Sequence, residues 1–274
     1  MNQPPANSDP ADNPYAHTPL TVAGDAVQPP ADSLAGRYPW AVFILPFAVY
    51  MVANSLEPAP DKPLNLGIVS IDYASYPIVY TAKLALVVAT MLALLPGYRQ
   101  FRCRVSPLAV VVGALGVVIW IGLCKLRIEQ TVLGPLGLDS VLGLGERAAY
   151  NPLEQLADRP ALAYGFLAVR LVGLAAIVPV IEEFFLRGFV MPYFVQPDWW
   201  RVPFGTVNRA ALAAGVIAPV LLHPAEMVAA AVWFSLVTWL MLRTRNIWDC
   251  VAAHAVTNLL LGIYVVTTGE WQFM

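Results

Sequence analysis

Charged residues are scarce in this chain. Lys, Arg, Asp and Glu together make up 12% of its 274 residues, whereas hydrophobic residues make up 58% and the mean hydropathy is +0.63. Soluble domains carry about 25% charged residues. The composition therefore excludes an ordinary soluble domain and indicates an integral, multi-pass membrane protein. The chain also lacks the basic stripe that binds nucleic acid, so no nucleic-acid partner is expected.

Cysteine is scarce as well. Cys103, Cys124 and Cys250 are an odd number and form no CxxC pair, which excludes a disulfide framework and a zinc ribbon. The sequence contains neither a Ser-His-Asp set nor an HExxH motif. Serine-type and HExxH-type zinc hydrolysis are therefore disfavoured, and we expect no cofactor.

The N-terminal residues 1–36 differ from the remainder of the chain. They are rich in Pro, Ala and Asp and show no apolar period, so they cannot bury enough surface to fold alone. They also lack the basic start and the apolar core of a signal peptide. We interpret residues 1–36 as a disordered tail and residues 37–270 as a transmembrane domain.

Apolar runs of nearly membrane-spanning length follow the tail. Seven of them are expected, at about 38–56, 74–95, 106–124, 161–180, 209–223, 226–242 and 247–267. Because helices tend to end before proline, the His223-Pro224 junction predicts a kink or a tight turn. The predicted fold is an all-α polytopic bundle of about seven or eight transmembrane helices, the eighth coming from 135–157 or 188–200.

Arginines recur in every second connection between these runs. They are Arg37, Arg99, Arg102, Arg104, Arg201, Arg209, Arg243 and Arg245. Cytoplasmic loops are enriched in Lys and Arg, so this alternation predicts a cytoplasmic N-terminus.

A pair of glutamates stands in the fourth apolar segment. A carboxylate at membrane depth costs roughly 2.5–3.5 kcal/mol and marks a functional site by default. Glu183 and Arg187 are four residues apart in the favourable order for an ion pair on a helix. Glu182 is turned by about 100° from its neighbour, so it faces elsewhere. The alternative is that both acids only pair with basic residues, such as Arg170.

Two histidines lie in the later apolar segments. His254 and Asn258 are four residues apart on one helix face, and both side chains can donate hydrogen bonds to an oxyanion. The alternative is that they hydrogen-bond between packed helices. With His223, they complete a set of residues that suits hydrolysis with Glu182.

These residues resemble the motifs of the CPBP family, which includes type II CAAX prenyl proteases and bacteriocin-immunity proteins. Residues 182–187 match the EExxxR motif, residues 254–258 match HxxxN, and His223 stands where the family has the histidine of FxxxH. The phenylalanine of FxxxH is replaced by Pro219. The resemblance covers about residues 160–267, and the chain is also similar to the CAAX protease-related proteins of bacterial exosortase systems.

The resemblance implies an intramembrane glutamate-type endopeptidase. Glu182 and His223 would activate a water, His254 and Asn258 would stabilise the oxyanion, and Glu183 with Arg187 would support the motif helix. The implied substrate is a membrane protein or peptide in the lipid bilayer, and the implied location is the inner membrane of a bacterium.

Two other functions are compatible with the same residues. Carboxylate and imidazole suit zinc, so a membrane hydrolase could hold the metal with Glu182, His223 and His254. A non-catalytic scaffold or a bacteriocin-immunity-type protein could keep the polar cluster for helix packing alone.

Overall fold

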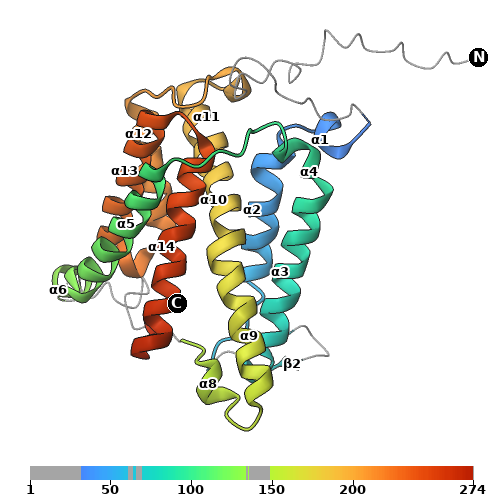
Figure 1. Ribbon diagram of the computed structural model, residues 1–274, viewed down its shortest axis with the longest axis vertical. Coiled ribbons are helices and arrows are strands. Elements are labelled where there is room, and N and C mark those ends of the chain that lie inside the picture. The colour runs from blue at the N-terminus through green and yellow to red at the C-terminus, as the bar shows by residue number, and fades with distance from the viewer. Residues whose placement is uncertain (1–31, 61–63, 66–69, 134, 136–148, 274) are drawn as a thin grey trace, which may run out of the picture.

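The computed structural model describes residues 32–60, 64–65, 70–133, 135 and 149–273. It confirms an all-α helix bundle (Figure 1). The elements of the N-terminal half are α1 (Leu34–Arg37), α2 (Ala41–Asn54), β1 (Leu64–Asn65), β2 (Ser70–Ile71), η2 (Tyr73–Ser75), α3 (Tyr76–Ala93), α4 (Leu95–Tyr98), α5 (Pro107–Lys125) and α6 (Ile128–Leu133). The two short strands pair antiparallel, with Leu64 opposite Ile71.

The C-terminal half contains a long composite helix followed by three further long helices. Its elements are α8 (Pro152–Gln155), α9 (Pro160–Val172), η4 (Gly173–Ile177), α10 (Val178–Phe185), η5 (Leu186–Val190), α11 (Met191–Val195), η6 (Trp199–Arg201), α12 (Arg209–Leu222), η7 (Pro224–Glu226), α13 (Met227–Thr244), α14 (Ile247–Thr268) and η8 (Trp271–Phe273). Helix α12 ends at Leu222 and η7 leads into α13, which confirms the predicted turn at His223-Pro224.

Most of the expected tail, residues 1–31, lies outside the described residues. The last residues of the expected tail are helical, because α1 begins at Leu34 and its N-terminus is capped by the Ser33 side chain. Part of the segment considered for an eighth helix, 136–148, is also outside the described residues. Among the described residues of that segment, Pro152–Gln155 form the short helix α8.

Five helices of the described chain are long and apolar enough to cross a membrane. Two further apolar helices, α2 and α12, have 14 residues each and are shorter than the usual span. The predicted count of seven spans is therefore not confirmed, although a helix occupies each predicted run. The first run is shortened because Tyr38–Trp40 connect α1 to α2 and do not belong to either helix.

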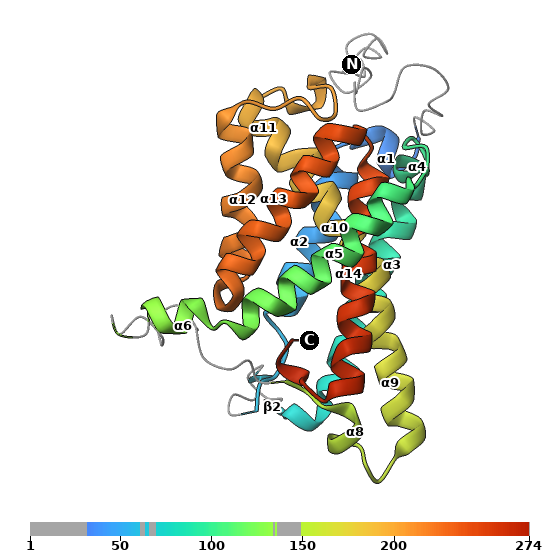
Figure 2. The ribbon, with the colours of Figure 1, turned by 60° about the vertical axis from the view of Figure 1, so that its left-hand side comes forward.

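The fourth span is longer than the sequence predicted. The helix continues from Pro160 to Val195 over 36 residues, or about 54 Å, and residues 188–195 belong to it instead of forming a separate helix. It runs along the whole bundle in Figures 1 and 2. Segment α10, which carries the glutamate pair, packs against α2 on one side and α14 on the other.

Two π-helical segments interrupt this long helix, and each is followed by a proline. The N–H of Val178 donates to Gly173 O, and the N–H of Met191 donates to Leu186 O. Pro179 and Pro192 come next in the chain and have no N–H to donate. Single π-helical turns in a helix are frequent at functional sites, and here they flank the glutamate pair.

Close packing of α5 against α14 places the second set of polar residues. A Cβ atom on Gly113 would lie 2.5 Å from Ala253 O, and one on Gly116 would lie 2.4 Å from Trp233 Nε1. The hydroxyl of Thr257 donates to Gly113 O, and Trp233 Nε1 donates to that hydroxyl. The two glycines therefore let α14 approach α5 at the level of the site.

The arginine-rich connections gather at one end of the bundle. Helices α1 and α4, the start of α12 and the turn from α13 to α14 lie at that end in Figure 1. The side chain of Asn246 donates to Arg104 O, which ties two of these connections together.

Candidate active site

Glu183 and Arg187 form the ion pair that their spacing predicts. Both side chains are fully buried, and Arg187 Nη1 contacts Glu183 Oε2 directly. Arg187 also donates from Nη2 to the backbone carbonyl of Phe234 on α13. The pair therefore connects the motif helix to a neighbouring helix. Glu182 faces another direction and lines a cavity.

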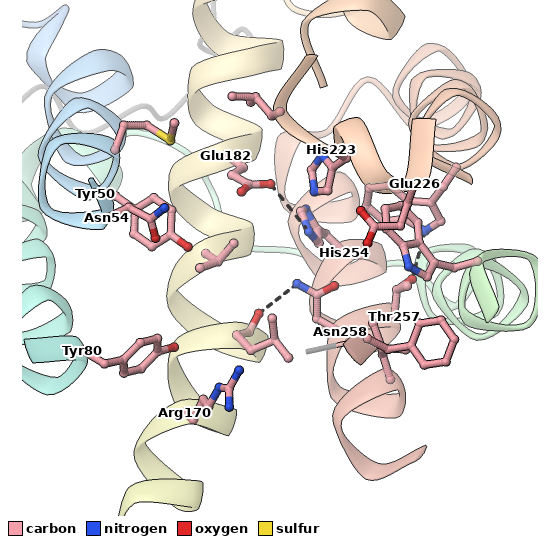
Figure 3. Close-up of a pocket in the computed structure, with 18 of the residues that line it drawn as sticks. Tyr50, Asn54, Tyr80, Arg170, Glu182, His223, Glu226, His254, Thr257 and Asn258 are labelled. Carbon is pink, nitrogen blue, oxygen red and sulfur yellow. Dashed lines mark hydrogen bonds and ion pairs between the residues drawn. The ribbon is translucent and has the colours of Figure 1, made fainter. Parts of the chain in front are cut away.

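His254 lies between the two carboxylates. Its Nδ1 is 2.9 Å from Glu183 Oε1, and its Nε2 is 3.9 Å from Glu182 Oε2 (Figure 3). The rings of Trp233 and His254 meet in an edge-to-face contact, with 4.7 Å between ring centroids. Motif spacing did not reveal that Glu183 contacts His254, because the two residues come from different helices.

Asn258 completes the polar face of α14. Its Nδ2 donates to Leu174 O in the π-helical segment η4, at 2.9 Å. In a regular helix Leu174 O would accept from the N–H of Val178, but that group donates to Gly173 O. Pro179 has no N–H to replace it. Asn258 thus satisfies a carbonyl that the π-helical turn and the proline leave without its usual donor.

His223 reaches the same cavity from the end of α12. Its Nδ1 is 2.8 Å from Pro219 O, which makes Nδ1–H the donor in this contact. Pro219 lies inside α12 and does not divert the histidine from the cavity. In Figure 3 the side chains of Glu182, His223 and His254 point into one space. His223 and His254 both pack against the ring of Phe234.

The cavity has a volume of about 390 Å³ and extends across the long helix. On the side of the long helix that faces away from His223 and His254, the cavity is lined by residues of α2, α3 and α9 and of the connection after α2. These residues, the second side of the cavity, belong to no motif that was recognised in the sequence. These residues are Tyr50, Met51, Asn54, Glu57, Tyr76, Tyr80, Lys83 and Arg170. Only the charge of Lys83 and Arg170 within apolar runs could have indicated them from the sequence.

The charged residues on this second side have partners of their own. Lys83 is buried, pairs with Glu57 and donates to Asn54 Oδ1. Arg170 donates from Nη1 to Tyr150 O at 2.6 Å. The sequence had suggested Arg170 as a partner of the glutamate pair, and the contacts of Glu183 are instead to Arg187 and His254.

In the described part of the chain, no group of three or more His, Cys, Asp or Glu side chains is arranged to hold a metal ion. The contact between His254 and Glu183 is a hydrogen bond between atoms that a zinc site would use as separate ligands.

Comparison with known proteins finds a match to a family model over part of the chain. Residues 164–260 match the family model described as Type II CAAX prenyl endopeptidase Rce1-like. The matched residues include Glu182, His223, His254 and Asn258, whereas α2, α3 and α5 lie outside the match. Searches among curated proteins and among solved structures find no match.

Proposed function

Because this chain carries a CAAX protease-like domain of a membrane endopeptidase family at residues 164–260, we propose that it hydrolyses a peptide bond in the cavity between α10, α12 and α14. The observation that carries the proposal is the position of His254 between Glu182 and Glu183, with His223 lining the same cavity. A carboxylate, two imidazoles and an amide meet there, and they supply the base and the donors that amide hydrolysis needs.

Glu182 is the general base in this proposal, and His223 helps to position the water. Glu182 accepts a proton as the water oxygen bonds to the scissile carbonyl carbon. It then returns this proton to the nitrogen of the leaving amine as the C–N bond breaks. Its side chain is 15% exposed, whereas Glu183 is fully buried, so Glu182 is the acid that water can reach.

His254 stabilises the oxyanion of the tetrahedral intermediate. The carboxylate of Glu183 accepts from Nδ1–H, which orients the ring and turns Nε2 toward the cavity. When Nε2 also carries a proton, its N–H can donate to the oxyanion. Glu183 thereby positions His254 in addition to its contact with Arg187.

Asn258 supports the oxyanion site from one turn further along α14. Its amide group has two N–H donors, and one of them is given to Leu174 O. The second donor remains for the substrate oxygen. The contact to Leu174 also fixes the rotamer, which holds the donor in place before the substrate arrives.

The substrate is a membrane protein or a membrane-associated peptide that enters from the lipid bilayer. The family resemblance favours the inner membrane of a bacterium, and we place the N-terminus in the cytoplasm because the arginine-rich connections share one end of the bundle. Cys103 is exposed at that end. In a C124A variant, an impermeant thiol reagent should label Cys103 in inverted vesicles and leave it unlabelled in intact cells, and the reverse pattern would overturn this orientation.

The catalytic proposal is tested with the purified full chain in liposomes and a library of membrane-anchored peptides, with mass spectrometry of the products. The wild-type chain should cleave, and Glu182→Gln should lower the rate by at least about 100-fold, the usual contribution of a general base. The matched control is Glu154→Gln, an exposed acid on α8 that should retain the wild-type rate. Cleavage by Glu182→Gln at the control rate would overturn the proposal.

Two further outcomes decide between the alternatives. Loss of cleavage on chelation with recovery on adding zinc would favour the metal-dependent hydrolase, because carboxylate and imidazole are zinc ligands. Failure of the folded wild-type chain to cleave any peptide of the library would favour the non-catalytic scaffold.

A further inference from the structure

Trp120 of α5 contacts His223 although it lies outside the residues that match the family model. The two ring centroids are 5.6 Å apart and the planes meet at 80°, which is an edge-to-face arrangement. Trp120 is partly buried and lines the cavity beside His223. Edge-to-face contacts favour one relative orientation of two rings, so this contact constrains the orientation of the His223 imidazole.

His223 needs such a contact because its backbone is not held inside a helix. It follows the last residue of α12, with φ −127° and ψ 60°, and precedes Pro224. The hydrogen bond from Nδ1 to Pro219 O fixes one edge of the ring. The rings of Trp120 and Phe234 both pack against the imidazole, and the centroid of Phe234 lies 5.7 Å from that of His223.

The local backbone explains how this arrangement replaces the phenylalanine of the FxxxH pattern. The N–H of His223 donates to Val220 O, so the helix tightens in its last turn. The carbonyl of Pro219, which would otherwise accept that N–H, accepts from the imidazole instead. The carbonyl of Pro219 is therefore the acceptor for the imidazole, and an aromatic ring beside His223 comes from α5.

We propose that Trp120 is the positioning residue of His223, through which a helix outside the matched domain sets the water-activating geometry of the site. The proposal rests on the proposed function, because Trp120 affects catalysis only if His223 takes part in it. The alternative is that Trp120 only fills space between helices, because its ring centroid also lies 6.3 Å from that of Trp233.

The first test is a double-mutant cycle on peptide cleavage. Trp120→Leu should lower kcat by about 10- to 100-fold with little change in KM, and Trp120→Phe should restore most of the rate because it keeps an aromatic ring. In a His223→Gln background, Trp120→Leu should have no further effect. Equal losses from Trp120→Leu in both backgrounds would overturn the proposal. Trp239→Leu is the control, because Trp239 is 49% exposed on the outer face of α13.

The second test does not depend on cleavage. The chain has three histidines, so an NMR spectrum of the protein labelled only at histidine contains three side-chain signals. The signals of His223 and His254 are assigned from the variants His223→Gln and His254→Gln. Trp120→Leu should shift the His223 signal, and Trp239→Leu should leave it unchanged. An unchanged His223 signal in folded Trp120→Leu would overturn the placement. If the wild-type chain cleaves nothing while this shift is present, the proposed function fails and the contact itself stands.

Discussion

The carboxylate of Glu183 and the imidazole of His254 meet across two helices, with 2.9 Å between Oε1 and Nδ1, although 71 positions separate the residues in the chain. The other oxygen of the same carboxylate contacts Arg187. One buried acid therefore neutralises the arginine of its own helix and orients the histidine of another. This double use links the stability of the bundle to the geometry of the proposed site.

Substitutions of Arg187 and Glu183, alone and together, can separate the ion pair of Glu183 from its contact with His254. Arg187→Met leaves a buried carboxylate without its arginine partner and should destabilise the chain by about 3–5 kcal/mol. Adding Glu183→Gln removes that charge, so the double variant should recover much of the thermal stability measured in detergent. It should remain inactive in peptide cleavage, because the negative acceptor for His254 Nδ1–H is gone. A double variant with wild-type activity would show that Glu183 does not orient His254.

The approach of α5 to α14 can be tested with two glycines of the same helix. Gly116→Ala should lower the melting temperature and the activity, because the added Cβ would lie 2.4 Å from Trp233 Nε1 and 2.8 Å from Thr257 Oγ1. Gly122→Ala is the matched control, since no atom lies within 4 Å of its added Cβ. Alanine there should leave activity unchanged and add about 0.5–1 kcal/mol of helix stability. Equal melting temperatures for the two variants would contradict the close packing.

The contact from Asn258 to Leu174 predicts a loss of both stability and rate. Asn258→Leu removes the donor for a carbonyl that lacks its usual helical partner, which should cost about 1–3 kcal/mol. Cleavage should fall with it, because a donor of the oxyanion site is lost. Thermal unfolding and kcat are measured on the same preparation. A leucine variant that unfolds and cleaves as the wild type does would refute both roles of the amide.

Lys83 and Glu57 provide a test on the second side of the cavity. Lys83→Met should destabilise the chain, because it leaves Glu57 without its ion-pair partner next to a buried surface. The double variant with Glu57→Gln should be more stable than Lys83→Met alone, and the coupling is read from melting temperatures of the four proteins. If the two losses simply add, the pair does not act as a unit.

Helix positions were predictable from the sequence to a large extent. A helix occupies each apolar run, and the break at His223-Pro224 follows from the restricted backbone before proline. The continuation of the fourth helix to Val195 was missed. The apolar run was expected to end near residue 180, whereas the helix continues through the buried ion pair of Glu183 and Arg187 to Val195.

The sequence by itself determined the membrane class, the helices and the i,i+4 pairs, because these depend on composition and on residues close in the chain. Only the tertiary structure decided that Glu183 contacts His254, that Asn258 bonds to the π-helical segment, and that Trp120 lies against His223. Each of these contacts joins helices far apart in sequence. Their formation depends on how closely the helices pack, as at Gly113 and Gly116, and no periodicity within one helix encodes that distance.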